Sequence, residues 1–247
     1  MNLKLKSVLL VAGLCLSAQA AVVYQDDFTG VAGSLLNGRS PNLVNTEGKT
    51  YTATDTLQLD GNGLAVSTSG AGSASIAMPA LTANDTVVMT AVFRPRSSSN
   101  NWMGFGLARD PAALTGDGAV WVLVRGGPHS NGGIVSISSG PGTAGNVYAT
   151  LAGTQPEAGF EGINPSTLKI TYIVKTGHMK VELGVNTVFE GLIAYNGTAG
   201  TPAPLDAIDY FTFQWNAQLT STSPTPGYFD SITVEVIRNK LKLVVIH

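Results

Sequence analysis

The feature that most constrains this chain is an alternation of apolar and polar side chains with period two, which recurs along most of its length. In residues 119–125, three valines at alternate positions would lie on one face of a strand, with Trp121 and Arg125 on the other. Residues 86–94 and 168–175 repeat the pattern. No segment keeps a helical period, so the pattern predicts half-buried strands of antiparallel sheets.

Glycine-rich turn clusters separate these strands, for example residues 60–63, 116–118 and 140–142. With 29 glycines, 12 prolines and 12% charged residues in 247, the composition suits many short strands. The glycines follow no collagen period, and the chain has no basic excess that would suit nucleic acid. About 210 residues without a linker predict one all-β domain, a two-sheet antiparallel β-sandwich of the jelly-roll type.

The first twenty residues have the pattern of an export signal. Lys4 and Lys6 precede an apolar run at residues 8–16, which is too short to span a bilayer comfortably. The small-x-small sequence at residues 18–20 is typical of a signal peptidase site. We therefore expect a signal peptide over residues 1–20, with cleavage after Ala20.

Cys15 offers an alternative, a lipoprotein anchor, but Leu14 precedes it where such a motif requires a small residue. Cleavage after Ala20 removes this cysteine, so the mature chain has no disulfide. The sandwich is expected over residues 21–237. Residues 238–247 form a basic C-terminal tail, which either extends the last strand or hangs free.

Several short motifs carry a resemblance to a known superfamily. They are residues 24–28 with 36–41, residues 102–108, residues 168–183 and residues 228–234. Their order resembles the concanavalin A-like lectin/glucanase superfamily, particularly laminin G-like domains of secreted bacterial proteins. The resemblance implies two packed sheets whose first and last strands are neighbours. Because this superfamily includes lectins, glycosidases, lyases and adhesion modules, it does not by itself assign a function.

Catalytic motifs of the superfamily are missing from the sequence. Retaining glucanases of this fold use an E-x-D-x-x-E run, and no such run occurs here. His129 and His178 lie in turn sequences and are better interpreted as solvated turn residues than as the base of a lyase. No Gly-x-Ser-x-Gly elbow and no His or Cys spacing for zinc is present. No catalytic residue is assigned, and a glycoside hydrolase or lyase with an unfamiliar site is the alternative.

Aromatic residues are the candidates for glycan binding, because sugar rings stack on aromatic faces while polar groups bond the hydroxyls. Trp121 and Arg125 share the strand face opposite the valines, and Trp102 follows a polar loop that ends at Asn101. These four residues are the predicted ligand-binding set. The alternative is that both tryptophans belong to the core, as is expected for Trp215 in its Phe-x-Phe-x-Trp sequence.

Acidic residues near both ends of the domain suggest a cation site. Asp27 and Asp230 would lie on neighbouring strands if the terminal strands pair, and carboxylates are ligands that calcium prefers. The preferred interpretation is that both close turns or bond backbone amides. A structural calcium ion is the alternative, and no other cofactor is required.

The net charge of the chain limits the classes of ligand that it is expected to bind. Without Lys4 and Lys6 the mature chain has 12 basic and 16 acidic residues, which is a net charge of −4. Without the three basic residues of the tail as well, residues 21–237 have a net charge of −7. A neutral glycan is therefore expected to be a better ligand than a polyanion. No membrane span is expected in the mature chain. The sequence predicts a non-catalytic carbohydrate-binding or surface-interaction module that is secreted, periplasmic or on a bacterial surface. A purely structural envelope protein is a further alternative.

Overall fold

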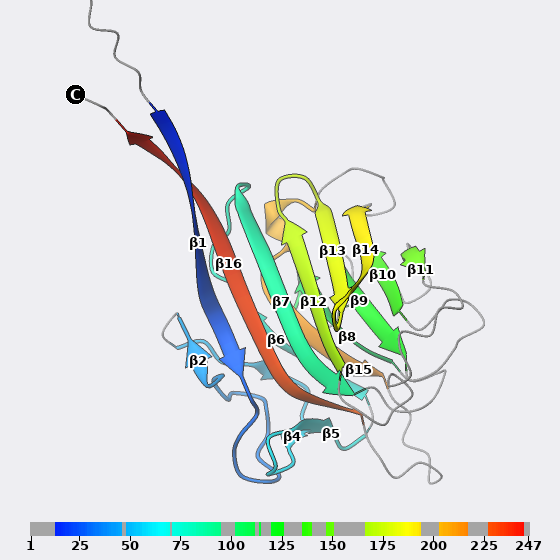
Figure 1. Ribbon diagram of the computed structural model, residues 1–247. Coiled ribbons are helices and arrows are strands. Elements are labelled where there is room, and N and C mark those ends of the chain that lie inside the picture. Colours follow the sequence, from blue (N-terminus) through cyan, green and yellow to red (C-terminus); the bar gives the residue numbers. More distant parts are fainter. Residues whose placement is uncertain are drawn as a thin grey trace, which may run out of the picture.

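The chain folds into two antiparallel β-sheets packed face to face (Figure 1). This arrangement confirms the predicted β-sandwich. The computed structural model describes residues 13–45, 48–69, 71–94, 102–111, 114, 120–125, 135–139, 147–150, 166–193, 203–216 and 227–244. It describes the backbone alone for residues 13–17, 125, 135–139, 147–150 and 239–244.

The first sheet, called sheet A, contains nine strands and faces the viewer in Figure 1. Seven of them follow the order β14-β13-β12-β7-β16-β1-β2, while β5 pairs with β16 and β4 with β5. The strands are β1 (Gly13–Asp26), β2 (Leu43–Val44), β4 (Leu57–Leu59), β5 (Ala65–Ser67), β7 (Asp85–Arg94), β12 (Ser166–Ile173), β13 (His178–Leu183), β14 (Asn186–Leu192) and β16 (Tyr228–Val244).

The second sheet, called sheet B, contains seven strands in the order β11-β10-β9-β8-β15-β6-β3. A short 3-10 helix, η1 (Leu205–Ala207), precedes β15. The strands are β3 (Thr52–Ala53), β6 (Ala71–Ala77), β8 (Trp102–Ala108), β9 (Val120–Arg125), β10 (Val135–Ser139), β11 (Val147–Thr150) and β15 (Tyr210–Asn216).

Alternate residues of both sheets fill the space between them, as the period-two pattern predicts. The aromatic residues of this core are in contact across the sandwich. Phe93 and Phe229 of sheet A stack with ring centroids 5.3 Å apart, and Trp215 of sheet B meets Phe229 edge-on at 4.8 Å. Trp215 is 1% exposed, so its assignment to the core is confirmed. The Tyr24 hydroxyl, on β1, donates a hydrogen bond across to the Ala77 carbonyl of β6.

The first and last strands are neighbours, as the resemblance implied. Their pairing runs from Gly13 opposite Val244 to Asp26 opposite Ile232, with a bulge after Val22. In Figure 1 this ribbon projects beyond the body of the sandwich. The C-terminal tail therefore extends the last strand up to Val244. The predicted signal peptide overlaps the start of β1, and its cleavage stays a prediction.

Asp26 anchors the chain where β1 ends. Its carboxylate is fully buried and accepts hydrogen bonds from both terminal nitrogens of Arg39, from the Tyr51 hydroxyl at 2.9 Å and from the Phe28 amide at 2.9 Å. Burial, together with the nearby Asp26 charge, holds the pKa of Tyr51 well above its usual range. Burial opposes the charge on Arg39, but Asp26 offsets this and raises its pKa. This cluster fixes the 26–51 connection against the core.

Candidate functional site

The outer face of sheet B, which points away from the core, combines aromatic and polar residues. Cross-strand partners lie on the same face of an antiparallel sheet, so the register gives the rows of this face. The first row holds Ser75, Thr212, Gly106 and Trp121; the second holds Ser73, Gln214, Gly104 and Leu123; the third holds Ala71, Asn216, Trp102 and Arg125. Hydroxyl and amide side chains thus occupy β6 and β15, and tryptophans occupy β8 and β9.

The two tryptophans contact each other on this face. Their ring centroids are 5.5 Å apart, with planes tilted by 44°. Trp121 also packs over the glycines of β8: a Cβ added to Gly104 would lie 3.2 Å from its ring, and one added to Gly106 would lie 2.6 Å from the Trp121 Cβ. The added Cβ atoms would lie closer still to backbone carbonyls of β9, 2.6 Å from Val122 and 2.3 Å from Val120, so neither position has room for a side chain. The two glycines therefore leave the space into which Trp121 packs.

Trp121 carries a polar atom without a partner. The ring is 0% exposed, and its indole nitrogen has no hydrogen-bond acceptor among the described residues. An orphaned buried donor costs on the order of 1–3 kcal/mol, so such a group calls for an explanation. The other buried polar groups of the first row, Ser75 and Thr212, are bonded to each other at 2.7 Å.

The connection between β8 and β9 lies over this face at two described residues. Ser75 donates its hydroxyl to the Pro111 carbonyl at 2.7 Å, and the Leu114 amide donates to the Gln214 side-chain oxygen at 2.9 Å. Leu114 is buried in a small apolar cluster with both tryptophans, Ala108 and Leu123. The first row of the face is consequently closed to solvent.

The third row is the more open end of the face. Trp102 is 5% exposed, and Asn216, its cross-strand partner on β15, is exposed. Arg125 faces Trp102 across β8 and β9, but its side chain lies outside the described part of the chain. Asn101 also lies outside the described residues.

The predicted set is therefore partly brought together. Sequence reasoning put Trp121 on the outer face, and the structure adds Trp102 to that face, but the rings are buried where an open aromatic surface was expected. Contact of either ring with a ligand stays a prediction. Sequence reasoning did not single out Ser73 and Ser75; their alternation with buried Ala74 and Ile76 is the signal that identifies their face.

Acidic residues are missing from the described strands of sheet B. None of its seven strands, within the bounds given above, contains an aspartate or a glutamate. A retaining glycosidase needs two carboxyl groups about 5 to 5.5 Å apart, and these strands do not supply them. In the described part of the chain, no helix is long and apolar enough to cross a membrane.

The predicted cation ligands have local roles in the structure. Asp27 is exposed and accepts hydrogen bonds from the Thr29 hydroxyl at 2.8 Å and the Thr29 amide at 3.1 Å, which together lower the pKa of Asp27. Asp230 lies at a bulge in the pairing of β16 with β7. The residues that the structure describes include no group of three or more His, Cys, Asp or Glu side chains suited to a metal. A structural calcium ion stays a prediction.

No family model matches this sequence, and a search of curated proteins finds no match either. Solved structures with the same fold do exist. An endo-1,3-β-glucanase from Streptomyces sioyaensis superposes with a TM-score of 0.56 at 14% identity, over 89% of this chain and 97% of that one. The CBM2 module of the evolved Dit protein of Lactobacillus casei BL23 phage J-1 gives 0.53 at 13% identity, over 90% and 97%.

A third similar structure is the carbohydrate recognition domain of Emp46p in its potassium-bound form, with a TM-score of 0.53 at 15% identity over 74% of this chain and 87% of that one. Enzymes and binding domains thus share this architecture. At these identities the likeness establishes the fold alone. The chain has the concanavalin A-like jelly-roll fold of lectins and glucanases.

Proposed function

We propose that this protein is a secreted, non-catalytic carbohydrate-binding module that takes a neutral glycan at the third row of sheet B. The observation that carries the proposal is the Trp102–Trp121 contact beside the exposed Asn216. An aromatic ring next to a side-chain amide offers a sugar both a stacking surface and a hydrogen-bond partner.

The two rings have different roles in this proposal. Trp102 is the ring that a sugar contacts, through the 5% of its surface that is exposed, because it belongs to the row that includes an exposed side chain. Trp121, wedged over Gly104 and Gly106, is a positioning residue that sets the tilt of Trp102. Asn216, the partner of Trp102 on β15, bonds the sugar hydroxyls, and Arg125 is the residue opposite Trp102 in the register with β9.

One feature supports binding rather than hydrolysis: the described strands of sheet B carry no carboxylate. The similar solved structures include binding domains as well as glucanases and are compatible with either activity. Because one similar structure is an endo-1,3-β-glucanase, a neutral 1,3-β-glucan is the first ligand to test.

The test uses the full chain on a panel of neutral and anionic glycans that includes 1,3-β-glucan. We expect a neutral member to bind, and we expect Asn216→Ala and Trp102→Ala each to weaken binding by about tenfold or more. Asn216→Ala is the more informative variant, because its side chain is exposed and contributes little to folding, so a loss of binding would report on the site itself. Thr187→Ala, at an exposed position on β14 of sheet A, is the matched control and should bind as the unchanged chain does.

Failure of every glycan to bind, or full binding by both variants, would overturn the proposal. Release of reducing sugar from 1,3-β-glucan above the blank would replace it with the alternative of a hydrolase.

A further inference from the structure

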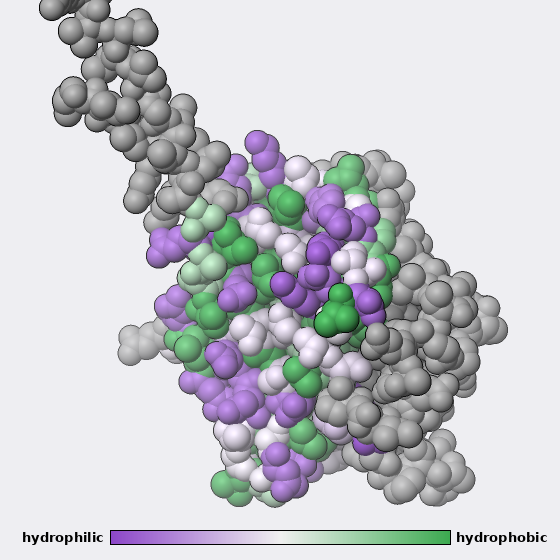
Figure 2. All heavy atoms as spheres, in the orientation of Figure 1, coloured by the Kyte–Doolittle hydropathy of each residue, from purple (hydrophilic) through white to green (hydrophobic). Residues whose placement is uncertain are grey.

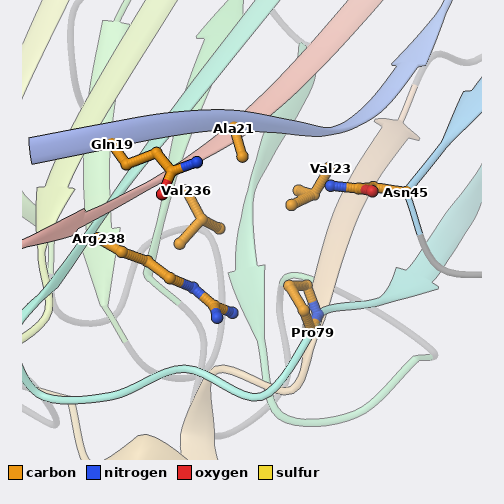
Figure 3. A pocket seen from close by; sticks show the side chains of 7 residues that line it. All are labelled: Gln19, Ala21, Val23, Asn45, Pro79, Val236 and Arg238. Carbon is orange, nitrogen blue, oxygen red and sulfur yellow. The ribbon is translucent and has the colours of Figure 1, made fainter. Parts of the chain in front are cut away.

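A hollow of about 300 Å³ lies between β1 and β16 of sheet A and the residues that follow β6 of sheet B (Figure 3). This volume lies at the lower end of the roughly 300–1,000 Å³ range of small-molecule sites. The hollow shares no residue with the outer face of sheet B and is independent of the proposed glycan site. Its lining residues are Gln19, Ala21, Val23, Asn45, Pro79, Val236 and Arg238.

The floor of the hollow is apolar. Ala21 lies directly opposite Val236 in the pairing of β1 with β16, so both point to the inner side of sheet A. Val23 and Val236 belong to the core between the sheets, and Pro79 closes the opposite wall just beyond the end of β6. The floor therefore lies at the margin of the hydrophobic core, where Val23 is 7% exposed and Val236 1% exposed.

The rim carries a cation that has no ionic partner in the described chain. Arg238 lies opposite Gln19 in the register, and its side chain extends across the hollow toward Pro79 (Figure 3). Its one recorded hydrogen bond goes to the Ala80 carbonyl at 3.5 Å, the limit for such a bond. Asp85 is its cross-strand partner on β7, but the Asp85 carboxylate accepts the Thr82 amide at 2.8 Å and forms no recorded ion pair with Arg238.

The remaining rim groups are neutral. Gln19 and Asn45 present side-chain amides, and none of the seven lining residues is acidic. A guanidinium fork matches a carboxylate with two parallel hydrogen bonds, and an amide can donate a further one. The chemistry of the site is thus one cation with amide donors above an apolar floor.

We propose that this hollow binds a small aliphatic carboxylate, with its carboxylate on Arg238 and its hydrocarbon chain on Ala21, Val23 and Val236. The site would give Arg238 the ionic partner that it lacks among the described residues. Cleavage after Ala20 would take Gln19 from the lining and make Ala21 the amino terminus, while Val23, Val236 and Arg238 belong to the chain in both forms.

Calorimetric titration of the full chain with hexanoate and with hexanamide tests the proposal, because the two probes differ only in the group that Arg238 would bind. We expect millimolar hexanoate to bind and hexanamide to bind at least about tenfold more weakly. Arg238→Gln should remove most of this difference. Ala21→Leu, which fills the floor, should weaken both probes.

Arg109→Gln is the matched control. Arg109 is an exposed arginine outside the hollow, with one recorded ion pair to Asp206 at 3.7 Å, and its loss should leave hexanoate binding unchanged. Absence of hexanoate binding, equal affinity for acid and amide, or full hexanoate binding by a folded Arg238→Gln variant would each overturn the proposal. None of these outcomes bears on the glycan site, since the two sites share no residue.

Discussion

The two outer faces of the sandwich differ in what covers them. The outer face of sheet A is open to solvent and mixes polar with apolar residues (Figure 2). It carries a cross-strand charge cluster in which Glu182 pairs with Lys180 at 2.7 Å and with Lys169 at 3.7 Å. The outer face of sheet B has strands without acidic residues, and its first row lies beneath Pro111 and Leu114.

This difference shows that the types of residue on each face match its exposure to water. Charged side chains suit sheet A because water screens and solvates them. A covered face must satisfy its polar groups internally, and sheet B does so with short hydroxyl and amide side chains bonded to the covering backbone. The indole nitrogen of Trp121 is the exception in the described part of this face.

The largest effect on stability is expected from removing the Trp121 ring from the outer face of sheet B. Trp121→Ala should lower the free energy of unfolding by about 3–5 kcal/mol, because it leaves a cavity between the glycines of β8 and Leu114. Trp121→Phe keeps a ring and removes the unpartnered nitrogen, so its cost should be much smaller. Urea denaturation of the three proteins measures both values. A cost below about 1 kcal/mol for the alanine variant would mean that the covered face is not packed.

A smaller effect is expected where the two sheets are bonded to each other. Tyr24→Phe removes the hydrogen bond to the Ala77 carbonyl and should cost about 1 kcal/mol at neutral pH. Burial raises the pKa of Tyr24 to about 12, against about 10 in an unfolded chain. Below pH 10 the hydroxyl is protonated in both states, and its contribution is fully present.

Between about pH 10 and 12 the unfolded chain loses the Tyr24 proton first, so the folded state loses stability as the pH rises. One proton corresponds to at most about 1.4 kcal/mol per pH unit. Urea midpoints measured from pH 9 to 11.5 should therefore fall less steeply for Tyr24→Phe than for the unchanged chain. Parallel curves would show that Tyr24 titrates alike in both states.

The smallest effect is expected on the open face. Glu182→Gln breaks both ion pairs of the cluster on sheet A, but these side chains are solvated, so the thermal midpoint should stay within measurement error. The difference in thermal midpoint between this variant and the unchanged chain should also stay the same when salt is added. A clear loss of stability would erase the contrast between the two faces.

Much of the fold was predictable because period-two alternation assigns each residue of a strand to a face. Residues 119–125 illustrate this: their valines are in the core and Trp121 lies on the outer side, as predicted. The pairing of the terminal strands followed from the resemblance and is confirmed from Asp26 to Gly13. The acidic sequence at Asp26 and Asp27 was less informative, because nothing local indicates that Arg39 and Tyr51 hold Asp26.

The sequence by itself determined many of the strands and which face their residues occupy, since these depend on neighbours one or two residues away. The tertiary structure brought Trp102 and Trp121 into contact from two strands. The tertiary structure decided which face is covered and where a hollow remains. Ser75 meets Pro111 across 36 residues and Leu114 meets Gln214 across 100, while the hollow joins β1, β16 and the turn at Pro79. Contacts over such separations arise from how two sheets of unequal length pack, which no local pattern encodes.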